Sequence, residues 1–354
     1  MFRIPIAAAV LVAAACAAAP AQPVIKRQGV KEAAADIATA VRAAAAAEKL
    51  AGVRVGRFTA VNIDPDTAGV TLAAEVAHAL GDLVNPKAES EVVGSYSFED
   101  DAKMKGAKVL RVQAKLLHVA DGKVLKNALA PETEVRFNTD VARLLAVTGA
   151  VDSQGSFRDR NAQIQKIWTT PTTAPRAKSE SLVSPTADSA FGVELRGREA
   201  KPFAATIANG QAVVKTQKGE AFELRLVNAG AAELAVAVAV DGLDLFAASD
   251  DKDEAGSSRF THLIVPAAKD GTPGEFVIPG RHKTTAAHKP NWDAFRAAAE
   301  GPAKLGMIHF AVEPSWPPGR VRDGRPISGL TPDGKPAKRE GDVPTEFLTI
   351  HYQR

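Results

Sequence analysis

The hydrophobic pattern of this chain changes at about residue 150, and that change limits the folds it can adopt. Before residue 150, helical and strand patterns alternate, whereas after about residue 190 only short strand-like runs between turn signals remain. One repeated architecture would show one pattern throughout. We therefore predict an α+β chain with an α/β mixed-sheet domain over 22–150 and an antiparallel β-sandwich domain over 190–354. A partly closed barrel is the alternative fold for the second domain.

The first part reads as helices and strands in turn. Residues 31–50 carry ten alanines between Ala33 and Ala47, and alanine has the highest helix propensity. One helical crossover followed by a meander predicts a mixed sheet with helices mainly on one face. The expected helices are 31–50, 68–84 and 139–147, and the expected strands are 53–58, 91–98 and 109–119 with a return strand after the Asp121-Gly122 turn.

The segments VRVGRF and AKVLRVQAKLLHVADGKVL, separated by a loop and a long helix, carry a resemblance. Over about residues 30–150 the chain resembles the periplasmic α/β domain of curli-secretion lipoproteins and the N-terminal domain of the Tol translocation protein. Those domains serve assembly and binding. The resemblance therefore implies a fold and a binding role, and it brings no catalytic residue.

Two stretches are poor in large apolar side chains. Residues 151–189, above all TTPTTAPRAKSESLVSPTADS at 169–189, are rich in Thr, Ser, Pro and Ala, and we predict a Pro/Ser/Thr-rich linker there. Ile164, Ile167 and Trp168 are its one expected docking point. Residues 313–345 are rich in Pro and Gly and predict a long surface loop before a last strand.

The second part contains a recurring pattern of strands and charged turns. The segments KGEAFELRLVN, VAVAVDGLDLF and FVIPGRHKT resemble a module of exported bacterial proteins of unknown function, over roughly residues 190–312. The recurrence of the two turns in that module suggests a turn-to-turn ion pair or a ligand contact. The candidate binding residues are Asp241, Asp244, Arg281, His282 and Lys283.

The N-terminus has the pattern of a secretory signal. Arg3 precedes an apolar run that ends in Ala19-Pro20-Ala21, which predicts a signal peptide over 1–21 and a periplasmic or secreted protein. The run is too short and too rich in alanine to favour a retained membrane span. Cys16 is the only cysteine. Cleavage before Cys16 would instead make it a lipidation site, and the protein a membrane-anchored lipoprotein.

Composition and motifs argue against several function classes. The chain has 44 basic and 41 acidic residues and 5% aromatic residues, so a basic stripe for nucleic acid and platforms for base stacking are not expected. Motifs of nucleophile elbows, zinc proteases and phosphate or dinucleotide loops are absent from the sequence. We therefore expect no catalytic residue, no metal and no cofactor.

Two clusters contain the residue types of metal or catalytic sites. The histidines His262, His282, His288 and His309 lack the usual spacing of zinc ligands, and isolated or hydrogen-bonded histidines are the favoured interpretation. Asp250, Asp251, Asp253 and Glu254 do not fit a calcium-loop template, and we predict a solvated loop there.

The sequence thus predicts a non-catalytic envelope or extracellular protein that binds or assembles with an unknown protein partner. The alternative is a metal-dependent hydrolase with its site on the β-sandwich loops, around His262, His282 and the acidic loop.

Overall fold

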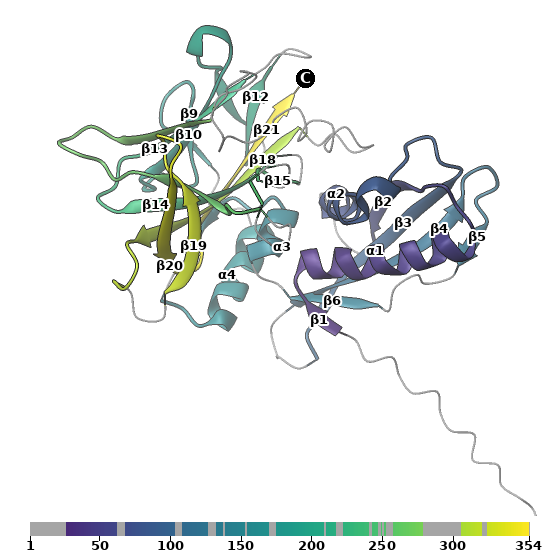
Figure 1. Ribbon diagram of the computed structural model, residues 1–354. Coiled ribbons are helices and arrows are strands. Elements are labelled where there is room, and N and C mark those ends of the chain that lie inside the picture. Colours follow the sequence, from purple (N-terminus) through teal and green to yellow (C-terminus); the bar gives the residue numbers. More distant parts are fainter. Residues whose placement is uncertain are drawn as a thin grey trace, which may run out of the picture.

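The computed structural model describes residues 26–61, 68–102, 108–126, 132–136, 139–152, 154–169, 175–208, 210–216, 222–240, 243–246, 249, 251–252, 258–278, 306–320 and 324–353. The predicted signal peptide over 1–21 with Cys16, and the candidate residues Asp241, Arg281, His282 and Lys283, lie outside these ranges. The described part is a mixed α+β structure with three sheets (Figure 1).

A six-stranded mixed sheet forms the first layer. Its order is β1-β6-β4-β3-β2, with β5 also paired to β4, and the pairs β1–β6 and β2–β3 are parallel while the others are antiparallel. The mixed sheet predicted for this region is therefore correct. The strands are β1 (Lys26–Gln28), β2 (Arg54–Ala60), β3 (Ser90–Asp100), β4 (Lys108–His118), β5 (Val124–Lys126) and β6 (Thr133–Arg136).

Helices α1 (Val30–Ala47) and α2 (Ala68–Leu80) lie along one face of this sheet (Figure 1). A short 3-10 turn, η1 (Gly81–Leu83), follows α2. Alanines and a few larger side chains of α1 are buried, because small residues let the helix lie close to the sheet. Among the described helices, none has both the length and the apolar character needed to cross a membrane.

Two further sheets enclose a second apolar core. The five-stranded sheet has the order β17-β13-β10-β9-β8, and the ten-stranded sheet runs β11-β12-β21-β18-β20-β19-β16-β14-β15, with β7 added on β21 and a direct β14–β18 pairing. Leu224 and Leu226 from the first sheet and Phe310 and Ile350 from the second belong to the same buried cluster. The two sheets therefore pack face to face.

The five-stranded sheet consists of β8 (Arg176–Ala177), β9 (Leu182–Ser184), β10 (Phe191–Arg196), β13 (Glu223–Asn228) and β17 (Gly274–Ile278). A 3-10 turn, η2 (Arg198–Ala200), follows β10. The ten-stranded sheet consists of β7 (Gly149–Ala150), β11 (Ala205–Ala208), β12 (Gln211–Lys215), β14 (Glu233–Val240), β15 (Leu243–Asp244), β16 (His262–Val265), β18 (Met307–Trp316), β19 (Arg325–Leu330), β20 (Pro336–Gly341) and β21 (Glu346–Gln353).

The larger sheet departs from the antiparallel prediction in two places. The pairs β12–β21 and β16–β19 are parallel. In addition, β14, β16, β19, β20 and β18 pair in a closed circuit. This ring lies within one sheet, and it matches the predicted alternative of a partly closed barrel only locally.

The predicted long loop over 313–345 is wrong for about half of its length. β18 continues to Trp316, and β19 and β20 form a hairpin that joins β16 on one side and β18 on the other. The prolines do not prevent this, because Pro336 begins β20 and Pro326 is the second residue of β19, near strand ends where a missing N–H is tolerated.

The predicted linker over 151–189 also contains ordered structure. Helix α4 (Phe157–Thr169) buries Ile164, with Ile167 packed beside it, so the docking point predicted at these two isoleucines is confirmed. The side chain of Trp168 is outside the described part. β9 buries Val183 completely, so the expectation that 169–189 stays unordered is wrong there. A three-residue strand obtains its hydrogen bonds from neighbours distant in sequence, which local composition does not reveal.

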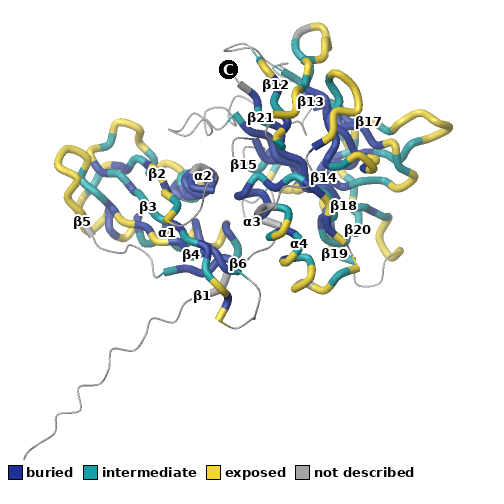
Figure 2. Tube along the Cα trace, turned by 180° about the vertical axis from the view of Figure 1, so that it is seen from behind, coloured by how far each residue is buried: buried dark blue, intermediate teal, exposed yellow. Residues whose placement is uncertain are grey.

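The apolar core around α1 and α2 extends beyond the six-stranded sheet to the ten-stranded sheet. Helix α3 (Thr139–Leu144) contacts α2 and β18, and the buried cluster around α1 and α2 includes Ala311 of β18 and Phe347 of β21. Figure 2 shows α2 as largely buried. The exceptions among its described residues are the exposed His78 and the partly buried Ala74, Ala77 and Ala79. This helix is covered on two sides, because it contacts β2 of the sheet and also α3.

Candidate functional site

Asp244 is the one predicted binding residue that the structure describes. One oxygen of its carboxylate accepts a hydrogen bond from the backbone N–H of Phe246 (2.9 Å), and the other lies 3.6 Å from Nζ of Lys31 at the start of α1. The turn therefore faces the helical layer. This arrangement agrees with a structural role for Asp244.

Asp244 belongs to a row of residues across the ten-stranded sheet. Asp244 pairs with Ala239, Ala239 pairs with His309, and His309 pairs with Thr349. Directly paired residues place their side chains on the same face of a sheet. Because His309 stands between Ile308 and Phe310 in the sequence, strand alternation predicts that it lies on the opposite face from them. This prediction is confirmed, since Ile308 and Phe310 point into the second core and the row lies on the other face.

Above this row lies a buried ion pair between two helices. Nη2 of Arg143 on α3 is 2.5 Å from Oε1 of Glu75 on α2, and both side chains are almost fully buried. A buried pair of this kind is costly to break, because removing either partner leaves a desolvated charge. Glu75 and Arg143 thus fix α2 and α3 to one another over the sheet.

His309 is the ionisable group of the row that is most completely buried. Its Nδ1 lies 2.9 Å from Oγ1 of Thr349, which in turn is placed to donate to the carbonyl of Val147 (3.4 Å), and its ring stacks on Phe347. Burial, together with the nearby charge of Arg143, lowers the pKa of His309 to about 3. Its Nε2 has no hydrogen-bond partner among the described residues. His309 is therefore neutral in the folded protein near neutral pH.

A second polar cluster lies inside the strand ring. Glu313 of β18 is 0% exposed, its Oε1 is 3.1 Å from Nε2 of His262, and Arg325 of the hairpin also binds that oxygen. The other oxygen, Oε2, has no hydrogen-bond partner in the described chain. Gly341 leaves room for this oxygen, since a Cβ at that position would lie 2.6 Å from it.

The same cluster contains a hydroxyl. Oγ1 of Thr261 is 2.8 Å from Nδ1 of His262 and 3.2 Å from the carbonyl of Ser328. Hydroxyl, imidazole and carboxylate thus stand in the order found in hydrolytic triads. Arg325 shares the carboxylate, however, and this reduces the support that Glu313 can give to a protonated imidazole.

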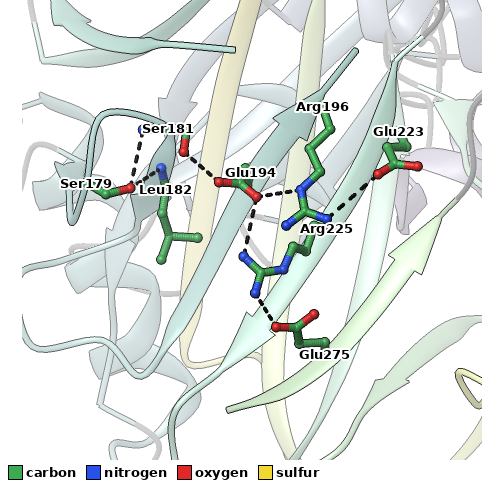
Figure 3. A network of polar contacts seen from close by, with 8 residues as sticks. All are labelled: Ser179, Ser181, Leu182, Glu194, Arg196, Glu223, Arg225 and Glu275. Carbon is green, nitrogen blue, oxygen red and sulfur yellow. Dashed lines mark hydrogen bonds and ion pairs between the residues drawn. The ribbon is translucent and has the colours of Figure 1, made fainter. Parts of the chain in front are cut away.

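A third polar cluster covers the outer face of the five-stranded sheet (Figure 3). Glu194 of β10 accepts hydrogen bonds from Ser181 (2.5 Å) and from Nε of Arg196 (2.6 Å), and it lies 3.3 Å from Nη1 of Arg225. Arg225 also binds Glu275 of β17. The sheet register places these residues in adjacent strands, with Glu194 opposite Arg225. We call these five residues the charge ladder.

The ladder charges stabilise one another. Burial acts to raise the pKa of Glu194, but hydrogen bonds from Ser181 and Arg196 and the two guanidinium charges outweigh it, so the pKa lies below its usual value. The hydrogen bond from Arg225 likewise lowers the pKa of Glu275. Both carboxylates are therefore ionised at neutral pH, and the ladder is a fixed array of charges.

The acidic loop weighed as a cation site is only partly described. Asp251 pairs with Nε of Arg259 at 3.2 Å, whereas residues 250, 253 and 254 lie outside the described ranges. In the part of the chain that is described, no group of three or more His, Cys, Asp or Glu side chains has the geometry to hold a metal ion. His262 is engaged with Glu313 and Thr261 instead.

Comparison with known proteins does not place this chain in a family. No family model, no curated protein and no solved structure matches it.

Sequence patterns missed most members of these clusters. The two glutamates Glu75 and Glu313 occupy positions that look solvent-exposed in one-dimensional patterns, and their basic partners are 68 and 12 residues away in the chain. Alternation along β10 and β13 could have shown that Glu194 and Arg225 face outward. That β10 pairs with β13 depends on the tertiary fold, so alternation along each strand could not have shown it.

Proposed function

We propose that this is a non-catalytic exported protein that binds or assembles with a protein of the envelope or the exterior. The surface that it offers is the outer face of the five-stranded sheet, with the charge ladder at its centre. The N-terminal sequence pattern supports export, either as a soluble periplasmic or secreted protein or as a lipoprotein anchored at Cys16.

The observation that carries the proposal is the charge ladder. Glu275 is 40% exposed and Arg225 23% exposed, so these charges are pinned by neighbours yet open to solvent. Val277, in the same cross-strand row as Arg225 and Glu194, is 40% exposed and adds an apolar contact point. Charged groups held on strands lose little side-chain entropy when a partner binds, which favours recognition.

We further propose that the chain divides into two units, 22–150 and 190–354, with 151–189 as the connection. The two large buried clusters support this division, since one centres on α1 and α2 and the other lies between the two later sheets. The packing of α3 and α4 gives the two units a defined contact, in place of the flexible tether that the linker composition favours.

A binding experiment with matched variants tests the proposed surface. The mature protein, immobilised on resin, is incubated with envelope extract from its source, and the retained proteins are identified by mass spectrometry. Glu275→Lys reverses an exposed ladder charge, and Lys335→Glu reverses an exposed charge on the β19–β20 hairpin as the control. We expect the same partner on wild type and on K335E, and at least tenfold less of it on E275K.

Two results would refute the proposed surface. One is equal recovery of a partner by wild type and by both variants, and the other is wild-type recovery no greater than that of bare resin. Folding of each variant is checked by circular dichroism, so that loss of structure is not mistaken for loss of binding. Mass spectrometry of the mature N-terminus separates lipidation at Cys16 from cleavage after Ala21.

A second candidate function is hydrolysis, favoured by the Thr261–His262–Glu313 array. Thr261 is exposed while the other two side chains are buried, so a substrate could reach the hydroxyl. The metal-dependent form of this candidate would need further ligands from outside the described residues, such as His282.

Ester turnover tests this candidate. The rate of p-nitrophenyl acetate hydrolysis is measured with and without added Zn²⁺ for wild type, Thr261→Val and His262→Gln, with His118→Gln as the control on the first sheet. A hydrolase would lose at least tenfold in both array variants and keep its rate in H118Q. Equal rates in all four proteins would reject hydrolysis at this site.

A further inference from the structure

The contact between the helical layer and the ten-stranded sheet contains a histidine that is built into the interface in its neutral form. His309 is 2% exposed and is covered from the helical side by α3. Because the hydroxyl of Thr349 is placed to donate to the carbonyl of Val147, its oxygen accepts a hydrogen bond from Nδ1–H of His309. Nε2 is then the unprotonated nitrogen of the ring.

A proton on Nε2 would have no acceptor within the described structure. It would create a second positive charge close to Arg143 in a site without water access, where unpaired charges cost most. The glutamate that could compensate, Glu75, is already bound to Arg143 at 2.5 Å. The closed interface therefore excludes the charged form of His309.

The other ionisable groups around His309 do not remove this conflict. From α1 and β15 come Lys31 and Asp244, which pair with each other at the far end of the row. From β21 comes His351, whose pKa is lowered by burial. β14 contributes Ala239, which carries no charge.

From this geometry we propose that mild acid opens the contact between the α2–α3 pair and the ten-stranded sheet, with His309 as the trigger. Opening exposes the face of β18 and β21 that carries Ala311, Phe347 and Thr349. This device is a property of the internal interface, so it does not depend on the binding surface proposed above.

The direction of the pH dependence follows from proton binding. In the closed state His309 has a pKa of about 3, whereas in the open, hydrated state it returns toward its ordinary value of 6.5. Above pH 6.5 neither state binds the proton, and the contact has its full stability. Between about pH 6.5 and pH 3 only the open state binds the proton, so the open population rises by up to about tenfold for each pH unit by which the pH falls.

Amide hydrogen exchange of the full mature protein tests the proposal between pH 7.5 and pH 5. Wild type is compared with His309→Gln at each pH, because the ratio removes the chemical pH dependence of exchange. In wild type we expect the opening population of α3 and of β21 to increase by about 30-fold from pH 7.5 to pH 5, and to stay nearly constant in H309Q. The ladder carboxylates Glu194 and Glu275 do not contribute, because their pKa values lie below the usual value of a glutamate.

Three controls separate this device from other causes. His351→Gln should retain the wild-type response, since His309 is the histidine that stacks on Phe347, and α3 contacts the strand that carries it. Amides of β10 and β13, which lie in the second core, should show no change between pH 6.5 and pH 5. A rise at these amides equal to that at α3 would indicate global unfolding and would overturn the proposal.

A measurement on unmodified protein covers the case in which H309Q does not fold. Nuclear magnetic resonance of the imidazole resonances reports the protonation of each histidine directly. We expect His309 to remain neutral in the closed protein down to pH 5. Titration of His309 near pH 6.5 in the folded state, without any opening, would also overturn the proposal.

Discussion

At the residue scale, the most constrained side chain is Glu313. It lies in the strand ring without solvent contact, and it is the shared partner of His262 and Arg325. Removing such a group is strongly destabilising, because its partners are then left buried without a counterpart. The intact cluster, however, stabilises the fold little more than a well-packed apolar core would.

We therefore expect Glu313→Gln to lower the free energy of unfolding by about 3 kcal/mol, because the substitution removes the buried charge that pairs with the guanidinium of Arg325. Urea denaturation monitored by circular dichroism measures this change. Asp333→Asn is the matched control, since Asp333 and Lys335 form an exposed pair in the hairpin turn and no measurable change is expected. Equal effects of the two substitutions would show that Glu313 is not held as described.

Residue-level patterns predicted some of this and missed the rest. The alternation around His309 correctly placed it opposite Ile308 and Phe310. The same reasoning could not show that both faces of β18 are buried, because the cover on the second face comes from α3 and the β19–β20 hairpin. Burial on the second face depends on how distant segments pack, which one-dimensional periodicity does not contain.

At the element scale, β3 and β2 approach each other closely at one glycine. A Cβ on Gly94 would overlap the ring of Phe58 and lie 2.6 Å from the backbone carbonyl oxygen of Gln113. Gly94 thus lets the Phe58 ring lie flat on the sheet, where it is almost completely buried. The register shift between Val55 and Phe58 in β2 is the local adjustment that brings this ring into place.

We expect Gly94→Ala to cost about 1–3 kcal/mol of stability through overpacking, because neither a backbone carbonyl nor a buried ring can move freely. Thermal unfolding followed by far-ultraviolet circular dichroism reports the loss as a lower Tm. Gly155→Ala is the control: its nearest neighbour would be the Cβ of Asp159 at 3.3 Å, and a change below about 0.5 kcal/mol is expected. A Tm of G94A equal to that of wild type would contradict the packing.

Element positions were predicted well where the pattern is long. The helix predicted at 31–50 is α1 over 30–47, and the strand predicted at 109–119 is β4 over 108–118. The hairpin β19–β20 was missed because its prolines and glycines are typical of loops. The hairpin is ordered by its pairing with β16 and β18 and by the bond from Arg325 to Glu313, and none of these contacts is local in sequence.

At the scale of the whole molecule, the two large cores are joined through the last strand. Phe347 belongs to the buried cluster of α1 and α2, while its neighbour Leu348 belongs to the cluster between the two later sheets. Alternate side chains of one strand therefore contribute to two cores. The polar composition of 169–189 suggests a loose connection between the two parts of the molecule, whereas the shared strand packs into both cores.

Phe347→Ala should accordingly destabilise both parts of the molecule, by about 3–5 kcal/mol in total. Hydrogen exchange should show faster opening of α1 as well as of β18. Phe276→Ala is the comparison, because Phe276 of β17 belongs to the second core, and it should leave α1 protected. Loss of protection confined to β18 and β21 in F347A would instead support units that unfold independently.

Strand β21 pairs with β18, β12 and β7, and it follows these three strands in the chain. The helical layer therefore lacks part of its interior until residues 346–353 have been synthesised. A nascent chain of this design stays incompletely folded up to that point. Such a delay suits a polypeptide that must pass through a membrane pore unfolded, as proposed for this one, and then fold on the far side.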